Sequence, residues 1–130
     1  MINLNELFKS GDWKGEKHIP VIEIEGEFKK GELVKVNITV GKEIPHPNTT
    51  EHHIRWISLY FHPKDEKFPY EIGKVEFSSH GESTQGPNTS TVYTEARVTF
   101  FFKTEKEGTL IAFSYCNIHG LWTNSLELKF

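Results

Sequence analysis

Apolar and polar residues alternate along much of this chain with a period of two, and no other feature limits its fold as strongly. Val34, Val36, Ile38 and Val40 fall on one face of an extended segment, and the residues between them are polar. Successive side chains of a β-strand point to opposite faces, so this segment is predicted to be a strand with one buried face. No long segment has the apolar spacing of a helix, and only a short helical turn near residues 5–9 is expected. The pattern predicts an all-β protein.

About seven strands are predicted, because residues that favour turns, mainly Gly, Pro and Asn, separate the apolar segments. The segments 54–61 and 110–115 are apolar on both faces, as expected of central strands. Many short strands divided by turns are typical of an antiparallel β-sandwich of two sheets. The predicted strands cover residues 21–24, 34–40, 54–61, 75–77, 92–102, 110–115 and 126–130.

Length and charge limit the organisation and the partners of the chain. A chain of 130 residues is expected to form one domain, here residues 1–130. Its formal net charge of −3 gives no basic surface for a phosphate backbone, so nucleic acid is not an expected partner. The sequence contains neither a long apolar run nor the charged-then-apolar plan of a signal peptide at its start. We therefore expect a soluble, cytoplasmic protein with no membrane partner.

Cys116 is the only cysteine, so the chain can form neither an internal disulfide nor a site of four thiolates. His119 follows three residues later, and Gly120 gives the backbone freedom to turn. After such a turn, the thiolate and the imidazole can bind one metal ion. The alternative is a buried cysteine that behaves as a small apolar side chain.

Other candidate ligands lie between residues 44 and 53. His46 stands between Pro45 and Pro47, in a stiff and extended segment that suits a metal ligand. His52 and His53 enter a predicted strand, where neighbouring side chains face opposite ways. At most one of these two histidines is therefore expected to face the same site.

The run Glu16-Lys17-His18 places a carboxylate, an ammonium group and an imidazole in succession. Taken alone, such a run is a solvated, charged loop. Beside a metal ion, Glu16 would be an exchangeable oxygen ligand, Lys17 would attract anions and His18 would be a fixed imidazole.

The candidate donors amount to four imidazoles and the thiolate of Cys116. Structural zinc sites are almost always four-coordinate, so five nitrogen and sulfur donors favour iron. The main competitor is a blue-copper site, which also combines a Cys with His ligands and usually has an axial methionine. The sole methionine is Met1, which disfavours copper, although Gln or a backbone oxygen can replace methionine.

Three motifs, in this order along the chain, resemble those of the superoxide reductases of the short neelaredoxin type. They are Glu16-Lys17-His18, His46-Pro47-Asn48-Thr49-Thr50-Glu51-His52-His53 and Cys116-Asn117-Ile118-His119. The resemblance spans about residues 11–122 and implies an immunoglobulin-like β-sandwich. The longer desulfoferrodoxin type has an additional N-terminal iron domain bound by four cysteines, which a chain with one cysteine lacks.

The resemblance also implies a mononuclear iron site and a role for each candidate residue. Glu16 is implied to occupy the open position in the resting ferric state, where superoxide binds in the ferrous state, and Lys17 is implied to lie near that open face. His53 is implied to be a non-ligand. The implied ligands are the equatorial imidazoles of His18, His46, His52 and His119 and the axial thiolate of Cys116.

The activity implied by the resemblance is the reduction of superoxide to hydrogen peroxide, an antioxidant reaction with electrons from an external donor, typically rubredoxin. Short members of the family are often homotetramers, so a homo-oligomer is expected. Two functions of other classes stay open: a cupredoxin-like electron carrier, and a non-catalytic module that binds or stores metal. Superoxide dismutation, which needs no added reductant, is a narrower alternative.

Overall fold

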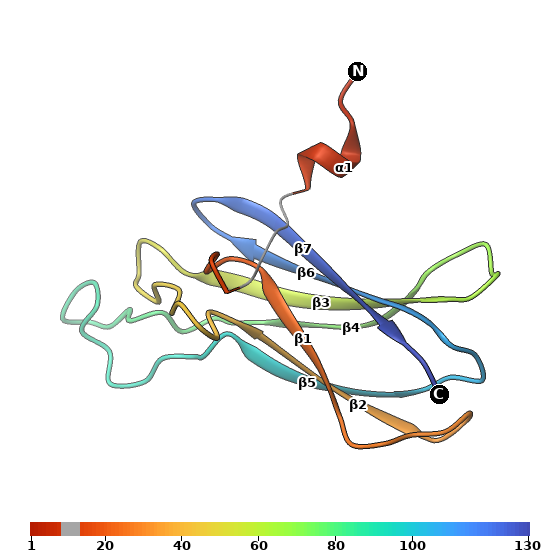
Figure 1. Cartoon of the computed structure of the whole chain (residues 1–130). Helices are drawn as coiled ribbons and strands as arrows, with labels where there is room; N and C mark the ends of the chain where they lie inside the picture. The colour runs from red at the N-terminus through yellow and green to blue at the C-terminus, as the bar shows by residue number, and fades with distance from the viewer. Residues whose placement is uncertain (9–13) are drawn as a thin grey trace.

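The computed structural model describes residues 1–8 and 14–130, which contain one short helix and seven strands (Figure 1). The helical turn predicted at residues 5–9 is found one residue earlier, and Lys9 lies outside the described residues. The helix is too short to cross a membrane. The elements are α1 (Leu4–Leu7), β1 (Pro20–Glu25), β2 (Leu33–Val40), β3 (Ile54–Pro63), β4 (Tyr70–Glu76), β5 (Arg97–Lys103), β6 (Gly108–Cys116) and β7 (Gly120–Leu128).

The strands form two antiparallel sheets that pack face to face. One sheet has the order β1-β2-β5 and the other the order β4-β3-β6-β7. Figure 1 shows the two sheets as layers, with α1 standing away from both. The prediction of an all-β, antiparallel sandwich is confirmed, and β3 and β6 are the central strands of the larger sheet, as expected from their apolar faces.

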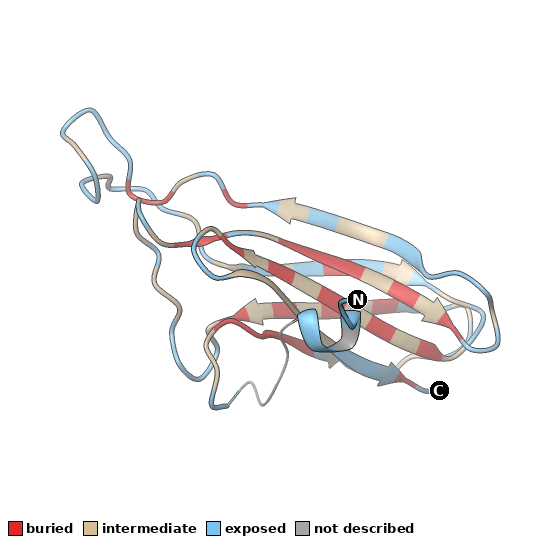
Figure 2. Ribbon diagram, turned by 90° about the horizontal axis from the view of Figure 1, so that it is seen from above, coloured by how far each residue is buried: buried red, intermediate tan, exposed pale blue. Residues whose placement is uncertain are grey.

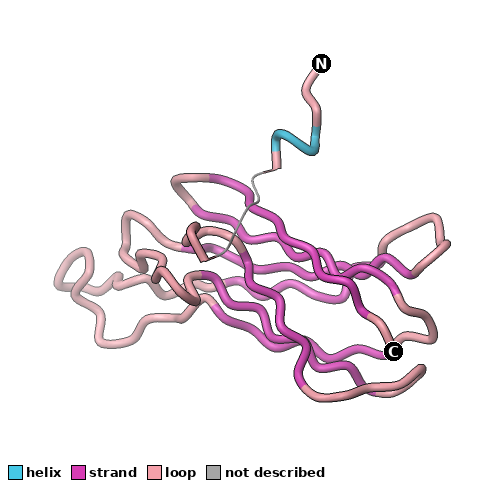
Figure 3. The backbone as a smooth tube through the Cα atoms, viewed as in Figure 1, coloured by secondary structure: helices cyan, strands magenta, loops and turns pink. Residues whose placement is uncertain are grey.

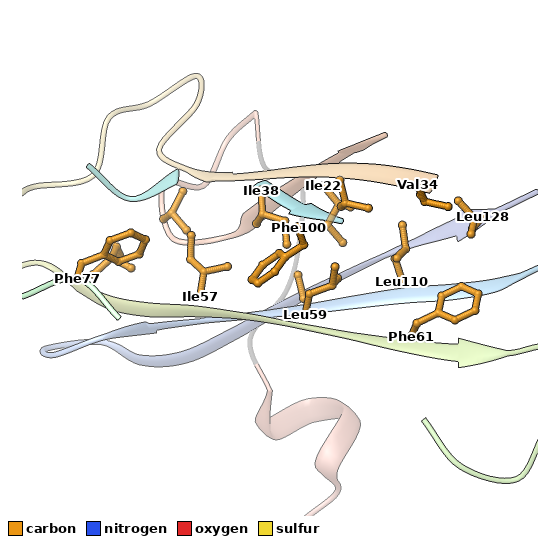
Figure 4. Close-up of a cluster of buried hydrophobic side chains, with 14 of the residues drawn as sticks. Ile22, Val34, Ile38, Ile57, Leu59, Phe61, Phe77, Phe100, Leu110 and Leu128 are labelled. Atoms are coloured by element: carbon orange, nitrogen blue, oxygen red, sulfur yellow. The ribbon is translucent and has the colours of Figure 1, made fainter. Parts of the chain in front are cut away.

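The core lies between the sheets and is built by the alternation seen in the sequence. Val34, Val36, Ile38 and Val40 are all buried, and the residues between them are partly exposed (Figure 2). They face Ile57, Leu59, Leu110 and other apolar side chains of the opposite sheet (Figure 4). Burying a side chain of this size contributes about 1.5–3 kcal/mol to stability, so the inward face fixes the register of each strand.

Three predicted strands begin at least five residues away from their predicted start. The strand predicted at residues 75–77 is β4, which begins at Tyr70 because it pairs with β3 from that residue on. The strand predicted from residue 92 begins at Arg97, which pairs with Thr39 at the end of β2, so Val92 lies before the pairing and is exposed. The strand predicted at residues 126–130 begins at Gly120, because β7 pairs with β6 along its full length. It ends at Leu128, which is buried. Pairing partners, which alternation does not reveal, decide these boundaries.

Candidate metal centre

Three segments, distant in sequence, meet at one end of the sandwich, where the chain leaves the sheets as loops (Figure 3). They are residues 14–19 before β1, residues 41–53 between β2 and β3, and residues 116–120 at the turn between β6 and β7. Strand register brings them together, since β1 begins at Pro20 opposite Val40 and β6 ends at Cys116 opposite Ile54.

Two glycines permit the backbone turns that this end requires. Gly41 has φ = +88°, and a Cβ atom there would lie 2.6 Å from the backbone nitrogen of His46. Gly120 has φ = +79°, directly after His119. A side chain at either position would be strained, so both glycines help to place the histidines beside them.

Four histidine rings form a nearly square arrangement. Ring centroids across the square, from His18 to His52, are 6.4 Å apart, farther than any pair of neighbours. Neighbouring rings are steeply inclined, at 61–78°. The neighbouring centroids are 4.7 Å apart for His18 and His46, 4.8 Å for His46 and His52, 5.0 Å for His52 and His119, and 4.8 Å for His18 and His119.

The thiol of Cys116 is fully buried beside these rings. Donor atoms of His18, His52, Cys116 and His119 all lie within 4.8 Å of one another. His46 joins this group through its ring contacts with His18 and His52. The backbone N–H of His119 donates a hydrogen bond to the Cys116 sulfur at 3.3 Å. Backbone hydrogen bonds of this kind tune the sulfur of a metal-bound thiolate.

Hydrogen bonds on the outer ring nitrogens of His18 and His46 direct the other ring nitrogens of both residues toward the centre of the site. His46 Nδ1 donates to the carbonyl oxygen of Pro47 at 2.7 Å, and His18 Nδ1 donates to Glu16 Oε1 at 2.6 Å. The inner nitrogens, His18 Nε2 and His119 Nδ1, are 3.1 Å apart. Metal-binding histidines are commonly held in this way by an acceptor on the nitrogen that faces away from the metal.

Two of the inner nitrogens, Nε2 of His46 and Nε2 of His52, are buried and have no hydrogen-bond partner among the described residues. Burying a polar atom unpaired costs about 1–3 kcal/mol, and such atoms are rare unless an ion or water completes them. Converging unpaired imidazole nitrogens beside a buried thiol are a donor set suited to a transition-metal ion. The residues present therefore fit a bound metal.

The electrostatics of the site favour the neutral form of three imidazoles, those of His18, His46 and His52, and metal binding requires this form. Burial lowers the pKa of His46 from 6.5 to about 4, against the opposing hydrogen bond to Pro47. Burial also lowers the pKa of His18 and His52, and for His18 the carboxylate of Glu16 opposes this effect. The charge of Lys17 adds a smaller lowering of the pKa of His18, His46 and His52.

Glu16 and Lys17 both lie at the rim of the site and are half-buried. Glu16 accepts hydrogen bonds from Nδ1 and from the backbone N–H of His18. Burial raises the pKa of Glu16, and the hydrogen bonds that it accepts from His18 help to lower it by more, so the side chain is a carboxylate. In this structure Glu16 therefore orients His18.

The expectation that only one of His52 and His53 faces the site is confirmed. His53 points away, stacks on His80 with ring centroids 3.5 Å apart, and donates from Nδ1 to the carbonyl oxygen of Thr49 at 2.9 Å. His80 Nδ1 lies 2.9 Å from Oδ1 of Asn48. This pair holds the loop that carries His46 and His52.

Sequence reasoning missed three residues that hold the ligands from outside. Ser114 Oγ donates to the carbonyl oxygen of His18 at 2.9 Å, Asn117 hydrogen-bonds to both neighbours of His52, and Trp122 stacks on His18. Asn117 could have been suspected from its place between Cys116 and His119. Nothing in the local pattern marks Ser114 or Trp122, because their contacts are made across the fold.

The fold and the site together define a β-sandwich protein with a histidine and cysteine metal site at one end. The chain belongs to the desulfoferrodoxin family, whose model matches residues 10–125. It is 64% identical over 126 residues to a superoxide reductase of Pyrococcus furiosus, covering 97% of this chain and 99% of the relative. It is also 52% identical over 120 residues to the neelaredoxin of Megalodesulfovibrio gigas, covering 92% of each chain.

The fold is shared with a solved structure of this family. The superoxide reductase (neelaredoxin) of Archaeoglobus fulgidus in the reduced form superposes with a TM-score of 0.89 at 58% identity, covering 95% of this chain and 99% of that chain. The resemblance inferred from the three sequence motifs is confirmed.

Proposed function

We propose that this protein is a superoxide reductase that holds one iron ion at this site and reduces superoxide to hydrogen peroxide. The observation that carries the proposal is the square of four imidazoles beside the buried thiol of Cys116. The close relatives named superoxide reductase and neelaredoxin support the same activity.

The donor set favours iron over the other candidate metals. Five nitrogen and sulfur donors exceed the four that a structural zinc site uses. Blue copper usually has an axial methionine, whereas Met1 is the sole methionine and is fully exposed at the start of the chain. We assign His18, His46, His52 and His119 as imidazole ligands and Cys116 as the thiolate ligand.

Bound iron would supply reversible one-electron chemistry and a cationic centre to which a small anion can bind. The overall reaction takes one superoxide, one electron and two protons to one hydrogen peroxide. The protein shields the Cys116 thiolate from water, and the His119 N–H donates a hydrogen bond to it. Burial and this hydrogen bond together set how strongly the sulfur donates electron density to the metal.

Lys17 is assigned to attract superoxide toward the site. The chain carries a net charge of −3, so attraction of an anion must come from local positive charge. Lys17 is half-buried, and its charge acts on three of the four imidazoles. Glu16 is assigned a second role as an exchangeable oxygen ligand of the resting ferric state, beside its hydrogen bond to His18.

The remaining assignments follow the family. The electron donor is a one-electron carrier of the rubredoxin kind. The protein is a cytoplasmic homo-oligomer, in the form of a tetramer. Residues 1–130 act as one domain.

Metal analysis and a reductant-dependent assay test the proposal together. Protein purified without added metal should contain one iron per chain, and it should consume superoxide repeatedly only when a reductant is supplied. Copper without turnover would instead identify an electron carrier, and zinc or no metal a binding module. Turnover without a reductant, accompanied by oxygen release, would identify a dismutase.

A further inference from the structure

Trp122 contacts two of the assigned ligands, which come from segments about a hundred residues apart. Its indole ring stacks on the imidazole of His18, with centroids 4.6 Å apart and planes 9° apart. Its Nε1–H donates to the carbonyl oxygen of His119 at 3.2 Å. Among the described residues, the indole of Trp122 is the one ring that stacks parallel on an assigned ligand. The four ligand rings contact one another edge to face or at a tilt.

The indole of Trp122 restrains the ring plane of His18, which the other partners of His18 do not. His18 lies in a turn segment just before β1, so no strand pairing holds its backbone. Ser114 fixes the carbonyl group of His18, and Glu16 fixes the direction of Nδ1. The hydrogen bonds at the two ring nitrogens, to Glu16 and to His119, leave the ring free to turn about the line that joins them, whereas a stacked indole fixes its plane.

The strand pair β6–β7 presents this restraint from a rigid support. Ser114 and Trp122 are directly paired across the two strands, and both reach His18, one through its backbone and the other through its ring. Binding groups placed on paired strands hold their geometry better than groups on loops.

The contact with His119 connects Trp122 to the sulfur of the site. The peptide groups of His119 are fully engaged, since its N–H donates to the sulfur of Cys116 and its carbonyl accepts from the indole. Removing the indole donor releases one end of this arrangement. The hydrogen bond from the His119 N–H to the Cys116 sulfur would then become longer or more variable. The electron donation of the thiolate to the metal would change as a result.

We propose that Trp122 is a positioning residue that fixes the plane of His18 and the peptide of His119 around the metal. This inference rests on the proposed function, because it takes the same residues as ligands. Trp122 acts through His18 and His119, and so it tunes metal affinity and the thiolate rather than reacting with superoxide.

Two variants separate the contacts of Trp122. Trp122→Phe keeps an aromatic ring over His18 and removes the N–H donor to His119. Trp122→Leu removes both. The matched control is Trp56→Phe, since Trp56 is also half-buried and its aromatic contacts are with Tyr115 and Lys74 rather than with a ligand.

Cobalt binding to the metal-free protein gives a readout independent of activity. Trp122→Leu should weaken Co²⁺ binding about tenfold, the size of effect usual for partners of metal ligands. Trp122→Phe and Trp56→Phe should bind Co²⁺ within about twofold of the unaltered protein. In addition, both Trp122 variants should shift the thiolate-to-cobalt charge-transfer band, and Trp56→Phe should not.

The inference is overturned if Trp122→Leu matches the unaltered protein in Co²⁺ affinity and in the charge-transfer band, or if Trp56→Phe changes both equally. Should Trp122→Leu fail to fold, a band in Trp122→Phe identical to that of the unaltered protein still overturns it. A failure of the proposed function can be distinguished from a failure of this inference, because the unaltered protein would then contain no iron or would not reduce superoxide.

Discussion

Asn117 and His53 are joined by a reciprocal pair of hydrogen bonds that links the two ligand-bearing loops. The backbone N–H of His53 donates to Asn117 Oδ1 at 2.8 Å, and the backbone N–H of Asn117 donates to the carbonyl oxygen of His53 at 3.2 Å. Asn117 Nδ2 also donates to the carbonyl oxygen of Glu51 at 2.9 Å. Asn117 follows Cys116, and Glu51 and His53 flank His52, so these bonds set the thiolate relative to one imidazole.

Asn117→Ala is expected to lower the free energy of unfolding by about 1–3 kcal/mol, because it leaves the backbone N–H of the buried residue His53 without its partner. Asn117→Asp keeps the acceptor for His53 and should cost less. Urea unfolding of the metal-free protein measures both. Asn37→Ala is the matched control, since Asn37 also makes hydrogen bonds through both ends of its amide, to Glu25 and Thr99, far from the ligands. Equal losses in Asn37→Ala and Asn117→Ala, with equal iron content, would contradict a special role for Asn117.

Glu16→Ala is expected to retain superoxide reduction and to change the visible absorption spectrum of the oxidised, iron-loaded protein. The change follows because the variant removes both the proposed oxygen ligand and the partner of His18 Nδ1. Glu16→Gln separates the two roles, since its amide oxygen can still accept from His18 but carries no charge. A spectrum of Glu16→Gln like that of Glu16→Ala supports a carboxylate ligand. An unaltered spectrum in Glu16→Gln limits Glu16 to holding His18, and an unaltered one in Glu16→Ala removes Glu16 from the site.

Lys17→Ala is expected to slow the capture of superoxide by up to about tenfold at low ionic strength, with iron still bound, because a local positive charge steers the anion. Pulse radiolysis at several salt concentrations measures the second-order rate constant. The difference from the unaltered protein should shrink as salt screens the charge. Lys64→Ala is the charge-matched control, because Lys64 is an exposed residue directly after β3 at the other end of the sandwich. Equal rate constants for Lys17→Ala and Lys64→Ala at low salt would disprove steering by Lys17.

The metal-free protein is expected to lose stability as the pH falls from 6.5 to about 4, the usual and the lowered pKa of His46. Within this window the unfolded chain binds a proton on His46 that the folded chain excludes, so acid favours unfolding. Above 6.5 neither state is protonated at this residue, and its contribution is constant. Urea unfolding across this range, compared with His46→Gln, gives the measurement. If the free energy of unfolding changes equally with pH in both proteins, His46 does not contribute to the loss of stability in acid.

The sequence alone determined the class of fold and the candidate ligands. Alternation in β2 and the two-faced apolar runs of β3 and β6 set the strands, because side-chain burial follows from local periodicity. The candidate ligands follow from three local features: the C-x-x-H turn, the proline-flanked His46 and the charged run before β1. The motif resemblance selected His52 over His53. Each of these signals is carried by a few consecutive residues.

Only the tertiary structure decided how the candidates are held. Glu16 holds His18 by a hydrogen bond to its ring, and Trp122 and Ser114 restrain the same histidine from a strand pair about a hundred residues away in sequence. The stacking of His53 on His80 likewise joins residues that no local pattern connects. Such contacts depend on strand register and on how two sheets pack, and both arise from the summed burial of the whole core. Local sequence therefore specifies which atoms can bind a metal, and long-range packing specifies their orientation.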